Sequence, residues 1–540
     1  MSQAQRGAIR SAFCGCQRTA ARHAVAVLVA ATAVAFAPAS LPAQAGSGAA
    51  PAAVDAAALQ ELDRYVAQAV RDWNIPGLAV AVVSGDRVVF MRGYGVREVG
   101  RPEAVDAGTR FAIGSTTKAM VAVALGILVD EGAVAWDAPV ITYLPWFRVA
   151  DPWLTRELTV RDLLTHRAGF PNIDQIWTNP GFTADEILRR VAGLETVYSP
   201  RSGFIYQNVM YAVAGAVIEA ASGMPWDAFV RTRILQPLGM TATEPTLAAL
   251  AGQANVAAPH TNAGGTIRLT SNRSVDQVGP AGSVWSSIDD MAKWMRFTLR
   301  GELHGRRLLS ERTHREIMSP QVVAPQSMYP AMTLVQPRFF TYGLGWFLHD
   351  YAGHAVAMHT GSINGMNALI GLLPDRDVGV YVLANVGGAE LRHALMYRVF
   401  DLFTGRPARD WSGELRALYA ARVQATAAQS SASSGPAGSA GAAGPSMPLE
   451  RYAGTYAHPV FGSVTVTLTG DQLRVSAELG RTGTLAHRQY DSFLATWTDD
   501  IGGAAAIVFM PDGAGGVRAL RAFGATFERV ATGAPGTLRP

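Results

Sequence analysis

Apolar positions recur at two different spacings along this chain, and the change of spacing predicts its first elements. Over residues 56–74 the apolar positions fall three or four apart, which is typical of an amphipathic helix. They are Leu59, Leu62, Val66, Val70 and Trp73. Two runs rich in β-branched residues follow, at 78–83 and 87–92, and Ser84-Gly85-Asp86 between them favours a hairpin turn.

A similar unit in reverse order closes the same region. Residues 367–385 predict two strands around a turn at 374–377, and a helical pattern over 390–403 follows. The long middle, about 111–300, has mostly helical periodicity and loops. The simplest assembly is an α/β (α+β) domain: an antiparallel sheet built from both ends, flanked by the N- and C-terminal helices, with a helical subdomain inserted between. A site would then lie where the sheet and the insert meet.

The pattern changes after this domain, which we place at 56–415. Residues 416–447 are expected to form a linker, because most of that stretch lacks apolar periodicity and is rich in Ala, Ser, Gly and Pro. Beyond it, Val464, Val466 and Leu468 alternate with threonines, and short alternating runs continue toward the end of the chain. We therefore expect a small all-β domain over 448–533, either a sandwich or a barrel.

Residues 1–45 have the order that is typical of a secretory signal peptide: basic, then apolar, then small. Four arginines precede or border the apolar stretch 24–37, and Ala43-Gln44-Ala45 offers a cleavage site. The apolar stretch is shorter than the roughly 20 residues that a membrane-spanning helix needs. We expect an exported protein, periplasmic or secreted, without stable membrane insertion after cleavage. An uncleaved N-terminal membrane anchor is the alternative.

Composition narrows the chemistry. A chain of 540 residues with 49% hydrophobic and 16% charged residues is globular and long enough for two domains. Cys14 and Cys16 both lie in the predicted signal peptide, so the mature chain would have no disulfide, thiolate metal site or cysteine nucleophile. Removing that signal peptide takes the formal charge from +4 to zero. No basic stripe indicates nucleic-acid binding, and no histidine spacing indicates a metal site.

Lys118 is one of two lysines in a chain with 46 basic residues. It comes three positions after Ser115 and opens a nearly uncharged run, 119–129, that predicts a helix buried on all sides. Ser115 would then stand at the helix N-terminus with Lys118 one turn away. A desolvated lysine can accept the proton of a serine hydroxyl, whereas arginine cannot. A Ser-x-x-Lys match also arises by chance, and an ordinary helix-face cation, as we expect for Lys293, is the alternative.

Two further motifs are candidates for the same site. Tyr206-Gln207-Asn208 precedes another apolar helical run; a phenol can shuttle a proton, and an asparagine amide can bind a substrate. The alternative is that Asn208 caps the helix and Tyr206 lies in the core. His359-Thr360-Gly361 is expected to begin an edge strand, where the glycine would let a substrate backbone approach. A turn with a surface histidine is the alternative there.

In the order Ser-x-x-Lys, Tyr-x-Asn, His-Thr-Gly, these motifs resemble the serine β-lactamase and penicillin-binding-protein superfamily. Segments such as "LTVRDLLTHRAGFP" and "GPAGSVWSSIDDMAKWM" are similar to the branch that holds C-type β-lactamases, D,D-peptidases, D-aminopeptidases and related esterases. The resemblance covers roughly 56–405. The part after the linker resembles the small β-barrel domain often appended to such hydrolases.

The resemblance implies a serine hydrolase that forms an acyl-enzyme on an ester or amide, with no cofactor and no metal. Ser115 would be the acylated nucleophile, and Lys118 or Tyr206 the general base. The residues implied in binding the substrate or its oxyanion are Asn208, His359, Thr360, Gly361 and Ser362. Among these, the backbone N–H groups of Ser115 and Ser362 would form the oxyanion hole. The expected partner is a small-molecule or peptide substrate, and the oligomeric state stays open.

One departure from the family pattern bears on the substrate. Many β-lactamases carry lysine where His359 stands, and a histidine is a weaker anchor for a carboxylate near neutral pH. We therefore expect a small ester or a peptide with D-residues, and a limb of the pH profile set by His359. A β-lactamase or D,D-carboxypeptidase is the nearest alternative, and a penicillin-binding or sensing module without turnover is another. We expect His166 to hold a loop by hydrogen bonds rather than to act as a second base.

Overall fold

The computed structural model describes residues 54–178, 182–433, 443–498 and 504–531. The predicted signal peptide lies outside the described residues. Within the described part of the chain, the predicted antiparallel sheet is confirmed as an eight-stranded sheet in the order β2-β1-β14-β13-β12-β11-β10-β9. The strands are β1 Gly77–Ser84, β2 Arg87–Gly95, β9 Val322–Val323, β10 Phe340–Tyr342, β11 Phe347–Tyr351, β12 His354–Ile363, β13 Met366–Leu373 and β14 Val378–Ala384.

The two ends of this domain meet inside the sheet, where β1 and β14 are its second and third strands. Strand β1 pairs with β14 from Leu78 opposite Ala384 to Ser84 opposite Val378. Alternate residues of β1 face opposite layers: Leu78, Val80 and Val82 belong to one apolar cluster, and the alanines and valine between them belong to the other. Because helices cover both faces, these central strands are apolar on both sides rather than alternating with polar residues.

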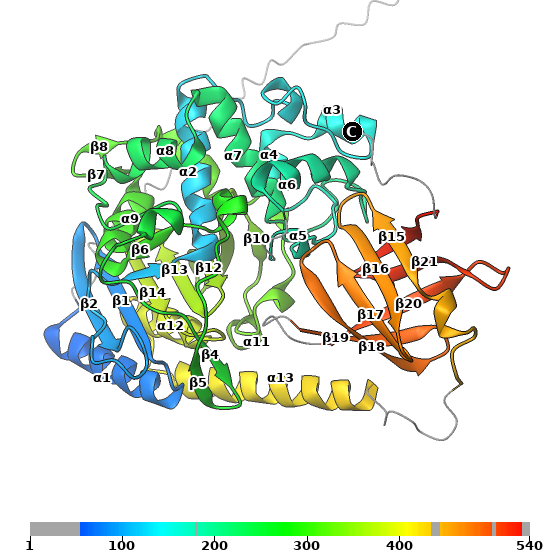
Figure 1. Ribbon diagram of the computed structural model, residues 1–540. Coiled ribbons are helices and arrows are strands. Elements are labelled where there is room, and N and C mark those ends of the chain that lie inside the picture. Colours follow the sequence, from blue (N-terminus) through cyan, green and yellow to red (C-terminus); the bar gives the residue numbers. More distant parts are fainter. Residues whose placement is uncertain (1–53, 179–181, 434–442, 499–503, 532–540) are drawn as a thin grey trace, which may run out of the picture. The chain divides into compact units, whose positions relative to one another are not determined.

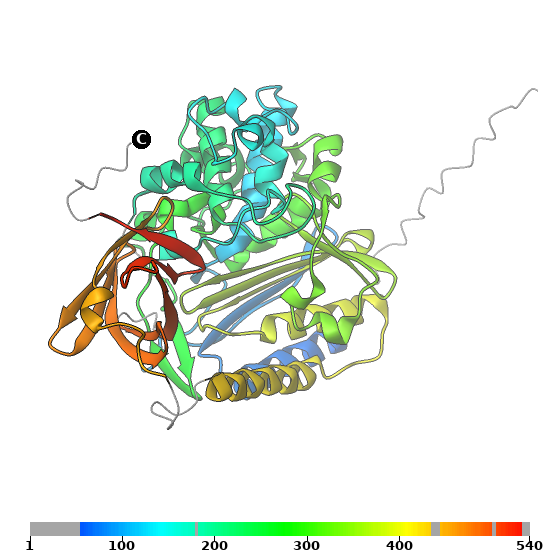
Figure 2. The ribbon, with the colours of Figure 1, turned by 90° about the vertical axis from the view of Figure 1, so that its right-hand side faces the viewer.

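The helices form two layers on this sheet (Figures 1 and 2). The helices α1 and α12 pack together on one face, while α9 contacts β1 and β14 on the other. The longer helices are α1 Ala56–Asp72, α2 Thr117–Asp130, α7 Val209–Ser222, α9 Ile288–Arg300, α12 Leu391–Thr404 and α13 Trp411–Ser433. The shorter ones are α3 Pro152–Glu157, α4 Val160–Leu164, α5 Gln175–Thr178, α6 Ala184–Arg190, α8 Trp226–Val230, α10 Glu311–Ile317 and α11 Met332–Val335.

Helix α2 is the centre of the inserted helical part. Its residues are buried continuously from Thr117 to Leu128, as the apolar run in the sequence predicts. It packs against α7, and the strand β12 lies against the short 3₁₀ turn η1 (Gly114–Thr116) that precedes α2. Short two-stranded sheets complete this part: β3 Arg110–Ala112 with β6 Trp285–Ser287, β4 His260–Ala263 with β5 Thr266–Leu269, and β7 Glu302–Leu303 with β8 Arg306–Arg307.

The predicted start of the linker at 416 is wrong. Helix α13 runs on to Ser433, and residues 434–442 of the expected linker lie outside the described residues. Trp411 and Leu415 are buried beside α12 and anchor the helix at its start. Alanine, which we treated as a sign of flexibility, is the strongest helix former once such an anchor starts the helix.

The expected C-terminal all-β domain is confirmed, and it is a barrel. Strands β15 to β22 form a closed barrel in chain order, with β15 paired to β22. The strands are β15 Gly454–His458, β16 Gly462–Thr469, β17 Gln472–Ala477, β18 Arg481–Gln489, β19 Ser492–Trp497, β20 Ala504–Pro511, β21 Val517–Ala522 and β22 Ala525–Arg529. Val464 and Val466 face its interior, as their alternation with threonines predicts.

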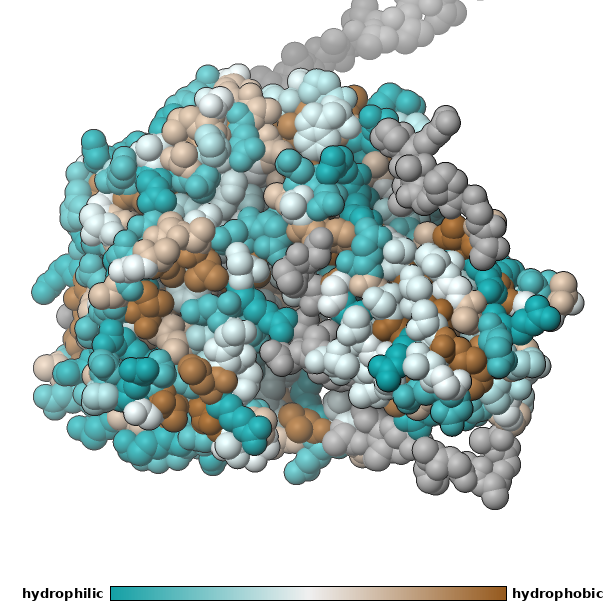
Figure 3. All heavy atoms as spheres, in the orientation of Figure 1, coloured by the Kyte–Doolittle hydropathy of each residue, from teal (hydrophilic) through white to brown (hydrophobic). Residues whose placement is uncertain are grey.

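The face of the molecule in Figure 3 is mixed, with apolar side chains scattered among polar ones. Among the described residues, no helix combines the length and the apolar character that crossing a membrane requires.

Candidate active site

Ser115 lies in the tight turn η1 at the start of α2. Gly114 adopts a left-handed backbone conformation (φ +53°), which glycine accepts without strain, and the helix begins directly after it. Thr116 fixes the turn because its hydroxyl donates to the Ile113 carbonyl (2.9 Å) and contacts the Tyr381 hydroxyl (2.6 Å). The nucleophile candidate is thus held by a rigid turn against the sheet rather than on a free loop.

Lys118 is fully buried directly below Ser115. Its Nζ lies 3.1 Å from Ser115 Oγ, 2.7 Å from Asn208 Oδ1 and 2.7 Å from the Ala281 carbonyl oxygen. Loss of hydration lowers the pKa of this amine from its ordinary 10.5 to about 7, and the negative charge of Asp174 opposes the shift only in part. The pKa of Lys293, the other lysine, shifts in the opposite direction. Burial also acts on Lys293, but its bonds to Asp290 and Asp289 outweigh burial and raise its pKa.

The partners of Lys118 suit a neutral amine. Asn208 donates its Nδ2 to the Asp174 carboxylate (3.0 Å), so the Asn208 atom that faces Lys118 is the carbonyl oxygen, an acceptor. The Ala281 carbonyl is also only an acceptor. A neutral amine has two N–H groups for these two acceptors and one lone pair left over. In the ammonium form a third N–H donates to Ser115 Oγ, and in the neutral form the lone pair can accept from the Ser115 hydroxyl instead.

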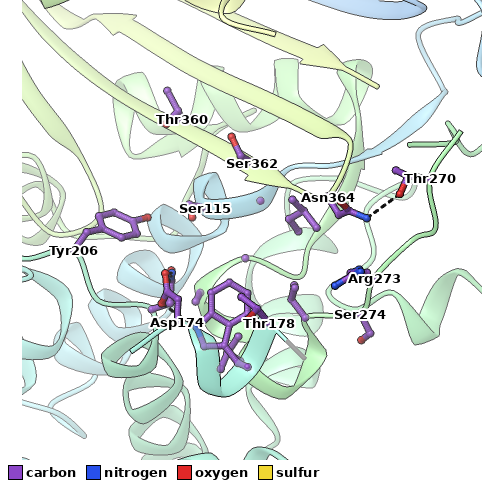
Figure 4. A pocket seen from close by; sticks show the side chains of 18 of the residues that line it. Ser115, Asp174, Thr178, Tyr206, Thr270, Arg273, Ser274, Thr360, Ser362 and Asn364 are labelled. Carbon is purple, nitrogen blue, oxygen red and sulfur yellow. Dashed lines mark hydrogen bonds between the residues drawn. The ribbon is translucent and has the colours of Figure 1, made fainter. Parts of the chain in front are cut away.

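Tyr206 lies beside this pair and borders the cavity. Its phenol oxygen points toward Ser115 (Figure 4), and the Lys118 Nζ lies 4.8 Å from the centre of its ring. Burial raises the pKa of the Tyr206 phenol well above its ordinary value, and the interaction with Ser115 offsets this only in part. Tyr206 therefore stays protonated under conditions in which Lys118 loses its proton.

His166 holds the segment that carries Tyr206, as the sequence predicts. Its Nδ1 accepts a hydrogen bond from the Gln207 backbone N–H (3.0 Å), and its carbonyl accepts one from the Ile205 N–H (3.0 Å). Its ring packs against the Tyr206 ring at a tilt, with 4.2 Å between ring centres. Burial keeps the pKa of His166 well below its ordinary value, so it serves as a neutral support.

Asp174 is the member of the site that sequence reasoning missed. It lies just before α5 and accepts hydrogen bonds from Asn208 Nδ2 and from Trp177 Nε1 (2.9 Å). This clamp orients the Asn208 amide. The alternative in which Asn208 caps α7 is wrong, since its side chain makes no cap bond. No periodic pattern marks Asp174, and the Ala281 carbonyl is a backbone atom that no motif can reveal.

The motif His359-Thr360-Gly361 lies near the end of β12, not at its beginning. Strand β12 is also internal to the sheet: it pairs with β11 along 354–358 and with β13 along 357–363, so the motif itself is bordered by one strand, β13. Gly361 does not border the cavity. A Cβ atom on it would lie 1.9 Å from the Ile113 carbonyl oxygen, so its role is to let β12 approach the turn that holds Ser115. Thr360 and Ser362 do border the cavity.

The expected substrate anchor at His359 is wrong. This side chain is buried beneath the cavity and is absent from its lining. Its Nδ1 donates to the Thr360 carbonyl (2.7 Å), and its Nε2 therefore accepts from the Tyr342 hydroxyl (3.0 Å). Burial, with the nearby positive charge of Lys118, lowers the pKa of His359 to about 3. A ring that is neutral and bonded on both sides cannot anchor a carboxylate.

We therefore expect His359→Asn to keep the parent's pH profile, against the expectation from the sequence. The imidazole titrates near pH 3, far below the range in which Lys118 changes charge. Activity against pH, measured from 5 to 9 in both proteins, checks this. A shift of the acidic limb by a full pH unit in the variant would show that the imidazole titrates in this range after all.

A cavity of about 780 Å³ opens above Ser115. Its walls come from η1, α5, the segment before α7, the β4–β5 hairpin, the loop into η6 (Asp276–Ala281), and the end of β12. The polar side chains on its walls belong to Ser115, Asp174, Thr178, Tyr206, Asn208, Thr261, Thr270, Arg273, Ser274, Tyr329, Thr360, Ser362 and Asn364. The three motifs that lie far apart in the sequence therefore meet around one cavity.

Comparison with known proteins supports this grouping. The β-lactamase family model matches residues 62–402, and the model of a domain of unknown function, DUF3471, matches 440–532. The chain is 29% identical over 442 residues to unguisins hydrolase ungD of Aspergillus violaceofuscus, covering 76% of each chain. It is 23% identical over 335 residues to protein flp of Staphylococcus aureus strain N315, covering 61% of this chain and 63% of flp.

Solved structures share the fold at lower identity. The octameric penicillin-binding protein homologue from Pyrococcus abyssi aligns with a TM-score of 0.59 and 21% identity, covering 87% of this chain and 99% of its own. The structure of SurE aligns with a TM-score of 0.54 and 23% identity, covering 88% and 99%.

Proposed function

This chain belongs to the β-lactamase family, and we propose that it is a serine hydrolase that cleaves an ester or amide through an acyl-enzyme on Ser115. The observation that carries the proposal is the buried Lys118 amine, whose Nζ lies 3.1 Å from Ser115 Oγ and has two further acceptors, Asn208 Oδ1 and the Ala281 carbonyl. When the amine is neutral, those two acceptors take its N–H groups and its lone pair can accept the Ser115 proton. A relative whose name describes a hydrolase supports the same reaction type.

In the first step Lys118 takes the proton of Ser115 while Oγ bonds to the substrate carbonyl carbon. The carbonyl π electrons move to its oxygen, which the backbone N–H groups of Ser115 and Ser362 stabilise. Between Lys118 and Tyr206, the contrast of pKa values favours Lys118 as the base, because the phenol keeps its proton well above the pH at which the amine loses one.

The intermediate collapses when the carbonyl re-forms and the bond to the leaving group breaks. The leaving group takes a proton through the Tyr206 phenol, which Lys118 replenishes. Asn208, held by Asp174, binds the substrate beside the scissile bond. A water molecule then attacks the acyl carbonyl, gives its proton to the same base, and Ser115 leaves as a restored hydroxyl.

For the substrate we propose a small ester or a peptide with D-residues, reached outside the cytoplasm. The basic-apolar-small order of residues 1–45 supports export. A β-lactam substrate is disfavoured by the absence of a cationic anchor at position 359, where a buried neutral imidazole stands.

The test is covalent labelling with a fluorophosphonate, followed by peptide mapping of the adduct. We expect a single adduct on Ser115, lost in Ser115→Ala, and release of more than one equivalent of product from a chromogenic ester. Labelling of a different residue would refute the site. A single equivalent of product without turnover would favour the binding or sensing module instead.

A further inference from the structure

The cavity has side chains of opposite charge at its two ends. Ser115, Tyr206 and Asp174 lie at one side, and Arg273 lies at the other (Figure 4). Arg273 belongs to the loop between β5 and η6, outside every motif that the family resemblance covers. Arg273 is the sole basic residue among the described residues that line the cavity. Lys118 is buried below Ser115 and does not border the cavity.

The Arg273 guanidinium is half-buried and has no hydrogen-bond or ion-pair partner in the part of the chain that the structure describes. Other arginines with restricted exposure are paired: Arg392 with Glu390 (3.0 Å) and Arg167 with Asp162 (2.8 Å). A guanidinium that is partly withdrawn from water favours an anionic partner. In this cavity that partner must come with the ligand or from outside the described residues.

The loop that carries Arg273 is fixed at both ends. At its start, Asn364 Nδ2 donates to Thr270 Oγ1 (3.3 Å) and to the Ser271 carbonyl (3.0 Å), which ties it to the turn after β12. At its end, the Asp276 carboxylate accepts the backbone N–H groups of Leu247 (3.0 Å) and Ala248 (3.1 Å). The guanidinium is therefore presented from an anchored segment joined to the strand end that carries Ser362.

Within the described part of the chain, no other cationic side chain near Ser115 is free to bind a substrate carboxylate. The two N–H groups of neutral Lys118 are taken by Asn208 and Ala281, and His359 is neutral and bonded on both sides. Asp174 adds negative charge at the Ser115 end. An anionic group of a substrate is therefore repelled from the end where cleavage occurs and attracted to the opposite wall.

We propose that Arg273 binds a carboxylate of the substrate, so that the enzyme prefers esters or amides that carry a free carboxylate away from the scissile bond. This rests on the proposed hydrolase function. A planar guanidinium offers two parallel N–H donors that match the two oxygens of a carboxylate. The neighbouring hydroxyls of Thr270 and Ser274 border the same wall and can donate further. A phosphate dianion would call for a second cation, and the described lining has none.

The experiment uses substrate pairs that differ only in charge, with the full mature chain. One series is the mono-4-nitrophenyl esters of linear dicarboxylic acids from butanedioic to octanedioic, each against its terminal carboxamide. A second series places the charge on the leaving group: N-acetyl-D-alanyl-D-alanine against its C-terminal amide. The readout is the ratio of kcat/KM for acid over amide, in the parent, in Arg273→Gln and in Arg273→Glu.

We expect the parent to prefer the acid in at least one series, and Arg273→Gln to lower that ratio by about 10- to 100-fold, mainly through KM. Arg273→Glu should lower it further. The matched control is Arg268→Gln, which removes the same charge from an exposed site on β5 outside the cavity lining and should leave the ratio unchanged.

An equal acid-to-amide ratio in the parent and Arg273→Gln, in both series, would overturn the assignment, as would an equal effect of Arg268→Gln. Fluorophosphonate labelling of Ser115 separates this failure from failure of the proposed function. If Ser115 is labelled and the ratio does not respond, the carboxylate site alone is wrong. If Ser115 is not labelled, the hydrolase proposal itself fails.

Discussion

Lys118→Met should lower kcat/KM for any substrate of this protein by about 10³- to 10⁴-fold, because in the proposed mechanism Lys118, 3.1 Å from Ser115 Oγ, accepts the Ser115 proton. Methionine fills a similar volume without a charge, so the buried site stays packed. The parent should gain activity as pH rises through about 7, where Lys118 becomes neutral. The variant should lose this limb. Initial rates from pH 5 to 9 measure both effects.

The same variant should be more stable than the parent. Lys118 has a lower pKa in the folded chain than in the unfolded chain, so between about 7 and 10.5 the unfolded state binds more protons. The parent's free energy of unfolding therefore rises with pH across that window, and below pH 7 the folded state carries the full cost of a buried ammonium. Each pKa unit corresponds to about 1.4 kcal/mol. Thermal unfolding at pH 6 should show Lys118→Met melting above the parent.

Lys293→Met is the matched control, because it removes the chain's other lysine from a paired and partly exposed site. We expect it to keep the parent's activity and its pH profile. If the Lys118→Met variant retains a tenth or more of the parent's kcat/KM, the amine is not the base, and Tyr206 becomes the candidate for that role.

Gly361→Ala should lower activity by about 100-fold or more and destabilise the fold by on the order of 3 kcal/mol. An added Cβ would lie 1.9 Å from the Ile113 carbonyl oxygen and 3.1 Å from the Ser115 backbone nitrogen. Both atoms belong to the backbone and cannot swing aside, so the turn that carries Ser115 must move away from β12. Chemical denaturation and kcat/KM measure the two effects.

Gly387→Ala is the control, since its nearest neighbours lie 3.9 Å from the added atom and its backbone is not left-handed. It should change stability by no more than about 0.5 kcal/mol. If Gly361→Ala behaves in the same way, the close approach of β12 to the nucleophile turn is not what holds Ser115 in place.

Local patterns in the sequence predict the skeleton of this fold well. The helix at 56–72, the strands on either side of Ser84–Asp86, and the buried helix after Ser115 follow from periodicity and turn residues, because each depends on contacts near in sequence. The boundary at 416 was wrong because composition alone cannot distinguish an alanine-rich linker from an alanine-rich helix that a buried tryptophan anchors.

Within the site, the motifs predict which side chains gather but not how each one is used. Ser115, Lys118 and Tyr206 meet as expected, whereas His359 turns away into a bonded, buried position and Gly361 serves packing. These roles depend on residues that lie far away in sequence, such as Tyr342 and Ile113. Asp174 and Arg273 lie in loops, and Ala281 ends the short 3₁₀ helix η6, so no periodic pattern marks them and only the assembled fold reveals them.

The pairing of β1 with β14 also limits when the nascent chain can fold. Because Leu78 of β1 pairs with Ala384 of β14, β1 lacks this partner strand until almost the whole domain has been synthesised. The turn that carries Ser115 likewise has no strand to rest against until β12, His354–Ile363, has been synthesised. A chain that stops before residue 354 therefore holds Ser115, Lys118 and Tyr206 without the strand against which the Ser115 turn packs.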